Sequence, residues 1–583
     1  MNSHVAALTQ TMIIYLILSV SYFGWGIAAI RILGISEQIS RFDISLIWLG
    51  WAVTLSIFQI LHFCFPLEAY IVGLIFSIGV AFSTPQIVKG FYRFHSNYSH
   101  RIKIFWRLII VLTVIIWIAS RAMITPTNYD SGLYHFNAIR WINSFAIVPG
   151  LGNLHGRLAF NQSFFTYVAA LNFYPFFGYG RSIANSFLLI LTIATFVSWL
   201  RPVFKQPLIL VESHPFQYAS IFFAFPFLGY LALSPTNLAS PSPDLTSTLL
   251  QLILFIMFAQ SIAEWTKGKE PNTYRVVVMN ILAATAITIK LSNLAFAVVI
   301  IGFSLAYTWK TSRLMRQGAI RIILPIVLII LIWGIQGYIL SGTPLYPSTI
   351  GYISAFDWAV PIESIKDEAN WVYSWARQPG VHWRKVLANW DWFAPWSQRI
   401  SQEFEVMYPL FVSIIFGIFT IIIHRLSRLK NVRPHLDLVI LYPALLGLIY
   451  WFLTAPDPRF ANALFSCLSL SAVLLFLAAV QPLMKKYLFV AILCVCSSVA
   501  NVHFIAYIVN HHDYIQAISA SGWYPVKTVP LVQKTTLSGL VIAIPAQGDQ
   551  SWDSPLPAAP QFNANLRLRI PGQLASGFTV TKP

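Results

Sequence analysis

Charged residues are scarce in this sequence: Asp, Glu, Lys and Arg make up only 10% of its 583 residues. A soluble domain carries about 25%. Because so few charges cannot cover a water-exposed surface of this size, most of the outer surface must face lipid. The aromatic content of 15% agrees, since Trp and Tyr rings favour membrane interfaces. The composition therefore excludes an ordinary soluble protein and predicts an all-α polytopic membrane protein.

Cysteine and the common cofactor motifs are nearly or wholly missing. The four cysteines (Cys64, Cys467, Cys494 and Cys496) lie in apolar runs without metal-ligand spacing, which excludes a disulfide framework, a zinc site and a redox motif. The sequence has no P-loop, dinucleotide fingerprint, metalloprotease helix or serine-hydrolase elbow. The net charge is +18, but no basic run or basic helix with interleaved aromatics accompanies it, so we expect no nucleic-acid partner.

Long apolar runs predict the membrane spans. The N-terminus lacks the basic region and cleavage site of a signal peptide, so we expect the first run to remain as a helix. A span needs about 20 apolar residues. On this criterion we predict about fourteen spans, near residues 11–30, 44–64, 69–88, 104–120, 183–200, 217–233, 246–263, 275–289, 293–309, 321–340, 408–424, 437–454, 462–480 and 487–510.

Basic residues predict the orientation of these spans. Most Lys and Arg residues lie in alternate loops, starting after the first span, which marks those loops as cytoplasmic and places both termini outside. Residues 160–178 are apolar enough to suggest another span. Counting them would reverse every later loop, so we interpret them as an interfacial or re-entrant helix. We therefore expect a multi-pass protein, and a bacterial cytoplasmic membrane is the favoured location.

The predicted topology divides the chain into three parts. Residues 1–103 form N-terminal transmembrane helices, and residues 104–510 form a transmembrane core with two large outer loops, 121–182 and 341–407. Residues 511–583 form an extracytoplasmic tail with a short β-like run at 539–545. This tail is too short for an independent enzyme domain, so we expect chemistry at the membrane core.

The first outer loop contains one acid, Asp130, within the run Asn-Tyr-Asp-Ser-Gly-Leu-Tyr-His. A carboxylate there could take a proton from an incoming hydroxyl. Alternatively, Asp130 caps the helix that follows it. Tyr129, Tyr134 and His135 are further candidates from the same run, although a satisfied interfacial histidine is the favoured interpretation of His135.

Four more polar residues are predicted to lie at the outer face. Asp244 precedes a span and either caps it or joins Asp130, and the two acids could share a divalent metal ion. Lys290 lies in a tight turn between two spans, where it either snorkels to the interface or binds a lipid phosphate. Arg459 could grip a phosphate, or pair with Asp457 two residues before it. Acids can activate a hydroxyl, while cations can stabilise a departing phosphate.

This combination resembles the GT-C superfamily of polytopic membrane glycosyltransferases, over roughly residues 104–480. The whole chain is also similar to a family of uncharacterised bacterial membrane proteins. The GT-C resemblance implies a GT-C-like core, a polyprenyl-phosphate-linked sugar donor, catalytic roles for Asp130 and Asp244, and phosphate binding by Lys290 and Arg459. Three spans before residue 104 and the short tail depart from the GT-C plan. The similar motifs are Tyr129-Asp130, Phe177-Gly178-Tyr179-Gly180-Arg181-Ser182, Asp244, Thr288-Ile289-Lys290-Leu291-Ser292 and Asp457-Pro458-Arg459-Phe460.

Three functions follow as expectations. The first is an inverting glycosyltransferase that moves a sugar from a polyprenyl-phosphate donor to a lipid, glycan or protein acceptor. The second is a polymerase or ligase of surface polysaccharide with the same phosphate chemistry. The third is a transporter or flippase, which requires ionisable groups at the bilayer midplane. The sequence places few charges inside its spans, and this disfavours the transporter.

Overall fold

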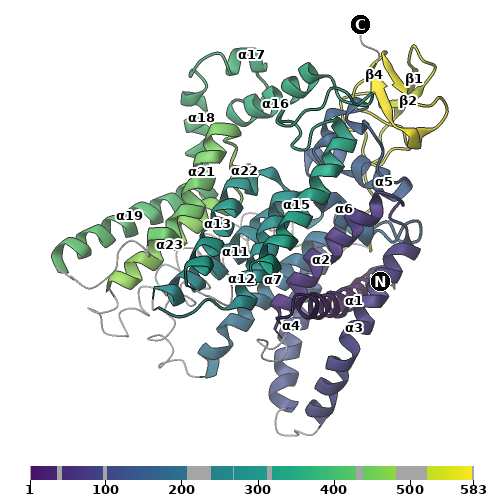
Figure 1. Cartoon of the computed structure of the whole chain (residues 1–583). Coiled ribbons are helices and arrows are strands. Elements are labelled where there is room, and N and C mark those ends of the chain that lie inside the picture. The colour runs from purple at the N-terminus through teal and green to yellow at the C-terminus, as the bar shows by residue number, and fades with distance from the viewer. Residues whose placement is uncertain are drawn as a thin grey trace.

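The computed structural model describes residues 2–35, 43–95, 101–205, 238–266, 268–311, 318–427, 438–480 and 522–580. Over these residues the chain is mostly helical, with a small β-containing tail (Figure 1). Eight of the described helices are long and apolar enough to cross a membrane. The predicted class of an all-α, multi-pass membrane protein is therefore confirmed in outline. The predicted spans at 217–233 and 487–510 lie outside the described residues.

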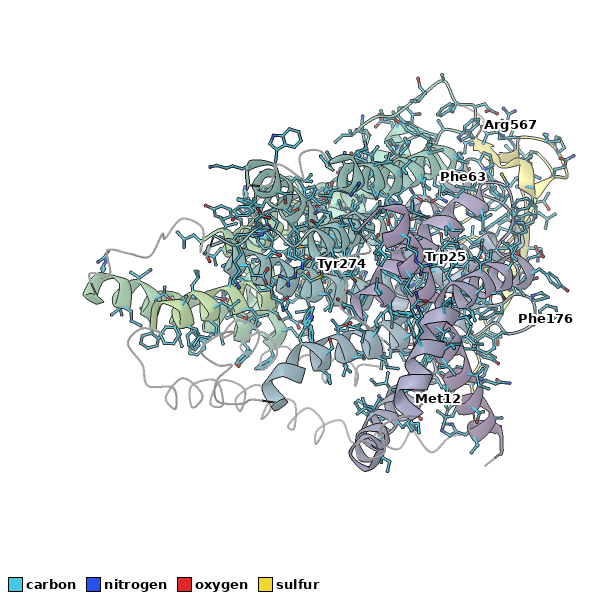
Figure 2. All side chains as sticks on the ribbon, turned by 60° about the horizontal axis from the view of Figure 1, so that its bottom comes forward. Met12, Trp25, Phe63, Phe176, Tyr274 and Arg567 are labelled. Atoms are coloured by element: carbon cyan, nitrogen blue, oxygen red, sulfur yellow. The ribbon has the colours of Figure 1, made fainter. Side chains whose placement is uncertain are left out.

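The N-terminal helices pack closely through glycine. α1 (Asn2–Ile32) lies against α2 (Ser45–His62) and α3 (Ala69–His95), and α4 (Arg101–Ala122) follows. A Cβ added at Gly50 would lie 1.7 Å from the carbonyl oxygen of Tyr22, so the α1 and α2 backbones touch there. Such close contact is typical of helices that associate in membranes. Trp25 on α1 lies within this packed region, whereas Phe176 and Arg567 lie at the periphery (Figure 2).

The remaining long helices form the rest of the bundle. α11 is buried along the whole of its apolar stretch, which makes it a central helix. α19 and α23 pack against each other at the side of the bundle away from α1 (Figure 1). The helices are α7 (Gly180–Lys205), α11 (Pro243–Trp265), α12 (Thr273–Ile289), α13 (Leu294–Thr311), α15 (Ile320–Ser341), α19 (Phe404–Ser427), α21 (Tyr442–Thr454) and α23 (Leu464–Val480).

Short helices gather with the tail at one end of the bundle, which we call the loop end (Figure 1). α6 lies in the segment 160–178; it has nine residues, all buried, and is too short to cross a bilayer of about 30 Å. A spanning role for this segment is therefore excluded, and the interfacial and re-entrant alternatives both stay predictions. The short elements at this end are η3 (Ser131–His135), α5 (Phe136–Ser144), η4 (Leu151–Asn153), η5 (Gly156–Ala159), α6 (Ser163–Leu171), η6 (Leu291–Asn293), α16 (Ile362–Arg377), α17 (Trp383–Val386), α18 (Phe393–Ile400) and α22 (Pro458–Ala461). A further short element, η7 (Leu438–Leu441), instead precedes α21.

The tail forms two antiparallel hairpins and a 3-10 turn, η9 (Leu574–Ser576). β1 (Leu531–Thr535) pairs with β2 (Val541–Pro545), and β3 (Leu566–Leu568) pairs with β4 (Phe578–Val580). β2 lies within the run that the sequence marked as β-like. The tail packs on the first large loop, because the backbone N–H of Trp552 donates to the carbonyl of Gly132 at 2.8 Å.

Candidate active site

Asp130 lies between α4 and η3, with its backbone held by Asn128. The Asn128 Oδ1 atom accepts the N–H of Asp130 at 2.9 Å. The Asp130 carboxylate is buried and accepts hydrogen bonds from Arg157 at 2.9 Å and from Arg459 at 2.5 Å. It makes no capping bond to η3. The helix-cap alternative for Asp130 is therefore wrong.

Asp244 lies in the first turn of α11, where Ser242 is the actual cap. The Ser242 hydroxyl accepts the N–H of Asp244 at 3.3 Å, and Pro243 occupies the first turn, as is common at helix starts. The Asp244 carboxylate is thus left for other partners. It forms ion pairs with Lys290 and with Nε of Arg459, the latter at 3.2 Å. Pro243 and Asp244 do start the helix, as the sequence predicted, but Ser242 and not Asp244 caps it.

Arg459 joins the two predicted acids. Its Nη2 atom binds Asp130 and its Nε atom binds Asp244, so one guanidinium spans two carboxylates. Asp457 does not pair with this guanidinium; it accepts the backbone N–H of Arg459 at 3.1 Å and forms a salt bridge with Arg399 at 3.0 Å. The Arg459 side chain is 43% exposed, against 9% for Asp130 and 12% for Asp244. A ligand from solvent therefore meets Arg459 before it meets the acids.

Lys290 reaches the same cluster from the end of α12. The helix ends at Ile289, and the extended backbone of Lys290 (φ −160°) directs the chain into η6. Its ammonium lies 4.4 Å from the ring centroid of Phe460, and the Arg459 guanidinium lies 5.0 Å from the same centroid. Since an aromatic face attracts cations, Phe460 supports both positive groups.

Two further members of the cluster, Arg157 and Glu368, were missed by the sequence analysis. Arg157 on η5 donates to Asp130 and lies with its Nε 3.4 Å from Glu368 on α16. The ion pairs thus run without a break through Glu368, Arg157, Asp130, Arg459, Asp244 and Lys290, which we call the charge chain. Its three acids and three bases alternate. The sequence did contain a signal for Arg157, because this residue lies in the same outer loop as Asp130.

The charge chain gives its two outer-loop acids different proton affinities. Burial acts to raise the pKa of Asp130, but Arg459, His135 and Arg157 outweigh it and lower that pKa to about 2. Burial raises the pKa of Glu368, and the single guanidinium of Arg157 does not reverse this. Burial alone would lower the pKa of Arg459, but the two carboxylates raise it above its ordinary value. Asp130 is therefore a fixed anion, while Glu368 binds protons more readily.

The other predicted candidates lie beside the charge chain. The Tyr129 hydroxyl donates to Asp549 of the tail at 2.5 Å, so it is engaged away from the acids. Tyr134 is buried, with its ring 5.8 Å from the Arg157 guanidinium. His135 contacts Ser131 at 3.2 Å, and burial lowers its pKa to about 4, which keeps it neutral at ordinary pH. A satisfied histidine is the interpretation that these contacts support.

The space around Arg157 also borders a small cavity. Its volume is about 50 Å³, and its lining includes Arg157, His62, Trp141 and Gln162. In the part of the chain that the structure describes, no three His, Cys, Asp or Glu side chains group to hold a metal ion. Arg459 lies between Asp130 and Asp244, and a metal shared by these acids stays a prediction.

Comparisons with other proteins give one result. No curated protein matches the chain, and no solved structure does. The family model described as "Domain of unknown function (DUF8201)" matches residues 9–466, which include Asp130, Asp244, Lys290 and Arg459. The chain therefore belongs to the DUF8201 family.

Proposed function

We propose that the protein is a membrane glycosyltransferase that moves a sugar from a polyprenyl-phosphate donor to a lipid, glycan or protein acceptor. One observation carries the proposal: Arg459 contacts both Asp130 and Asp244, although 329 residues separate it from Asp130. Acids and cations that the sequence scatters over four loops thereby form one site. This is the set of groups that transfer from a lipid phosphate requires.

In the proposed reaction, the cations and the anions of the charge chain have different roles. Arg459 and Lys290 hold the donor phosphate and stabilise its charge as it leaves, with Arg459 offering a planar fork and Lys290 a point charge. Asp130 and Asp244 orient the acceptor hydroxyl and the sugar on the opposite side. Attack opposite the phosphate inverts the anomeric centre.

The proposed topology places this site outside the cell. We retain fourteen spans, a GT-C-like core and a bacterial cytoplasmic membrane as parts of the proposal. Its support is that Asp130, Asp244, Lys290 and Arg459 come together, which requires their four loops to lie on one side, as the distribution of Lys and Arg predicts. Exposed Trp375 and Trp390 on the second large loop suit a membrane interface or a sugar face.

A donor-release assay tests the proposal. Purified protein in lipid is incubated with short-chain polyprenyl-phosphate sugars, and free polyprenyl phosphate is followed by mass spectrometry. We expect release by the wild type and none by Asp130→Asn, because the amide can neither hold Arg459 as an anion nor stabilise positive charge in the transition state.

The matched control is Asp357→Asn. Asp357 is an exposed acid paired with Arg569 at 2.7 Å, outside the charge chain, so this variant should keep wild-type release. Release that is unchanged in Asp130→Asn would contradict the assignment. Elongation of a lipid-linked glycan without single-sugar transfer would favour the polymerase or ligase, and substrate flux without covalent product would favour the transporter.

A further inference from the structure

Arg157 connects two carboxylates that differ in how firmly they are held. Asp130 accepts hydrogen bonds from Arg157 at 2.9 Å and from Arg459 at 2.5 Å. Glu368 has a looser ion pair, with its Oε1 atom 3.4 Å from Arg157 Nε, and this buried atom accepts no hydrogen bond. Asp130 thus accepts a charge-assisted hydrogen bond on each oxygen, while Glu368 Oε1 accepts none.

Glu368 also has a restricted setting at the loop end. It lies on the inner side of α16, with 18% of its side chain exposed, while Glu363 on the same helix is 77% exposed. A Cβ added at Gly156 would lie 3.0 Å from Glu368 Oε2 and 2.7 Å from the Tyr346 hydroxyl, so η5 and Tyr346 close around this carboxylate. The ionisable groups that face it are Arg157, Asp130 and Tyr346.

We infer that Glu368 is the general base of the reaction and that Asp130 is not. This inference rests on the proposed function. A base must give up and take a proton near the working pH, and a pair of acids whose environments differ reveals which one does so. Burial raises the pKa of Glu368, whereas two arginines hold Asp130 as a permanent anion.

The step balances as follows. The acceptor O–H gives its proton to the Glu368 carboxylate, and the oxygen lone pair forms a bond to the anomeric carbon. The bond between that carbon and the phosphate oxygen breaks, and its electron pair leaves with the phosphate. Glu368 later returns its proton to water. Arg157 pairs with both carboxylates and so keeps Glu368 and Asp130 in a fixed relation during this step.

The pH dependence of donor release, with a saturating acceptor alcohol, tests this role. Wild-type turnover should fall on the acid side as Glu368 becomes protonated. Glu368→Gln should lose about 100-fold or more in turnover and show no acid limb. Glu363→Gln, on the same helix, should retain the wild-type rate and profile because Glu363 pairs only with exposed Lys366. Donor affinity should be similar in all three proteins.

Two more variants test whether the loss of turnover in Glu368→Gln comes from a lost base or only from a disturbed structure. Glu368→Asp should keep an acid limb at reduced rate, and added formate should restore part of the turnover of Glu368→Ala, since formate can accept the proton in the vacated space. Release by the wild type together with an intact acid limb in Glu368→Gln would overturn the inference alone. A wild type that releases nothing from any donor would overturn the proposed function and the inference with it.

Discussion

At the scale of single residues, the charge chain depends on groups that share their ion-pair partners. Arg459 serves two acids, Arg157 serves two acids, and Asp130 lies between the two arginines. Removing one partner of a buried ion pair leaves the other charge uncompensated, which is strongly destabilising. Loss of Asp130 would leave both arginines with one carboxylate each.

Stability should therefore depend on pH through Asp130. Its pKa is about 2 in the folded protein, against 3.8 ordinarily, so its stabilising effect is complete above about pH 4 and is lost as the pH falls towards 2. The loss should be about 2 kcal/mol. Thermal unfolding in lipid nanodiscs, compared between wild type and Asp130→Asn, measures it. The stability difference between the two proteins should shrink across this range; a constant difference would show that Asp130 is not held as an anion.

Much of this residue-level picture could be predicted, and part could not. The sequence did point to Asp130, Asp244, Lys290 and Arg459, because charged side chains near a bilayer are energetically costly and usually functional. Their pairing was not visible, since it joins positions 46 to 329 residues apart. Glu368 was missed because α16 also carries Glu363 and Asp367, and sequence does not show which acid faces inward.

At the scale of elements, the tail fixes the segment that carries Asp130. The Asn137 side chain donates to Ser551 at 2.7 Å, Gln550 donates to the carbonyl of Tyr129 at 2.8 Å, and Arg140 pairs with Asp553 at 3.0 Å. Five consecutive tail residues, 549–553, thus contact both sides of Asp130. The sequence analysis expected an extracytoplasmic tail but assigned it no role.

A single methyl group should disturb this contact. A Cβ added at Gly132 would lie 2.6 Å from the Trp552 ring, so Gly132→Ala must push the tail away. We expect a destabilisation of about 1–3 kcal/mol and faster proteolytic cleavage within 549–553, followed by mass spectrometry. Gly73→Ala is the control, because a Cβ there meets nothing within 4 Å. Equal cleavage of the two variants would contradict the tail's role.

The helix α6 shows where the prediction of membrane spans from apolar runs fails. α6 is as apolar as a span, and only the distribution of basic loops argued against counting it; the structure ends it after nine residues. The all-α class followed directly from composition. The fourteen spans remain a prediction, because eight described helices meet the length and apolarity needed to cross, and four more are shorter.

At the scale of the whole molecule, the orientation can be tested by chemical labelling. On a background without native cysteines, Glu363→Cys at the loop end should react with a membrane-impermeant maleimide added to intact cells. Lys269→Cys, in an exposed turn between α11 and α12, should react only after the cells are opened. Labelling of Lys269→Cys in intact cells would reverse the orientation and place the site inside.

The alternation of the charge chain has a consequence for the molecule as a whole. Three acids and three bases already neutralise one another, so an arriving phosphate finds no vacant positive charge among them. Under the proposed function, the donor phosphate enters by exchange: it takes Lys290 and the Nε of Arg459 from Asp244, while Arg157 and the Nη2 of Arg459 stay on Asp130. On this proposal, binding of the donor frees the Asp244 carboxylate. The same carboxylate competes with simple anions for the two cations, so donor binding and release of the acid are one event.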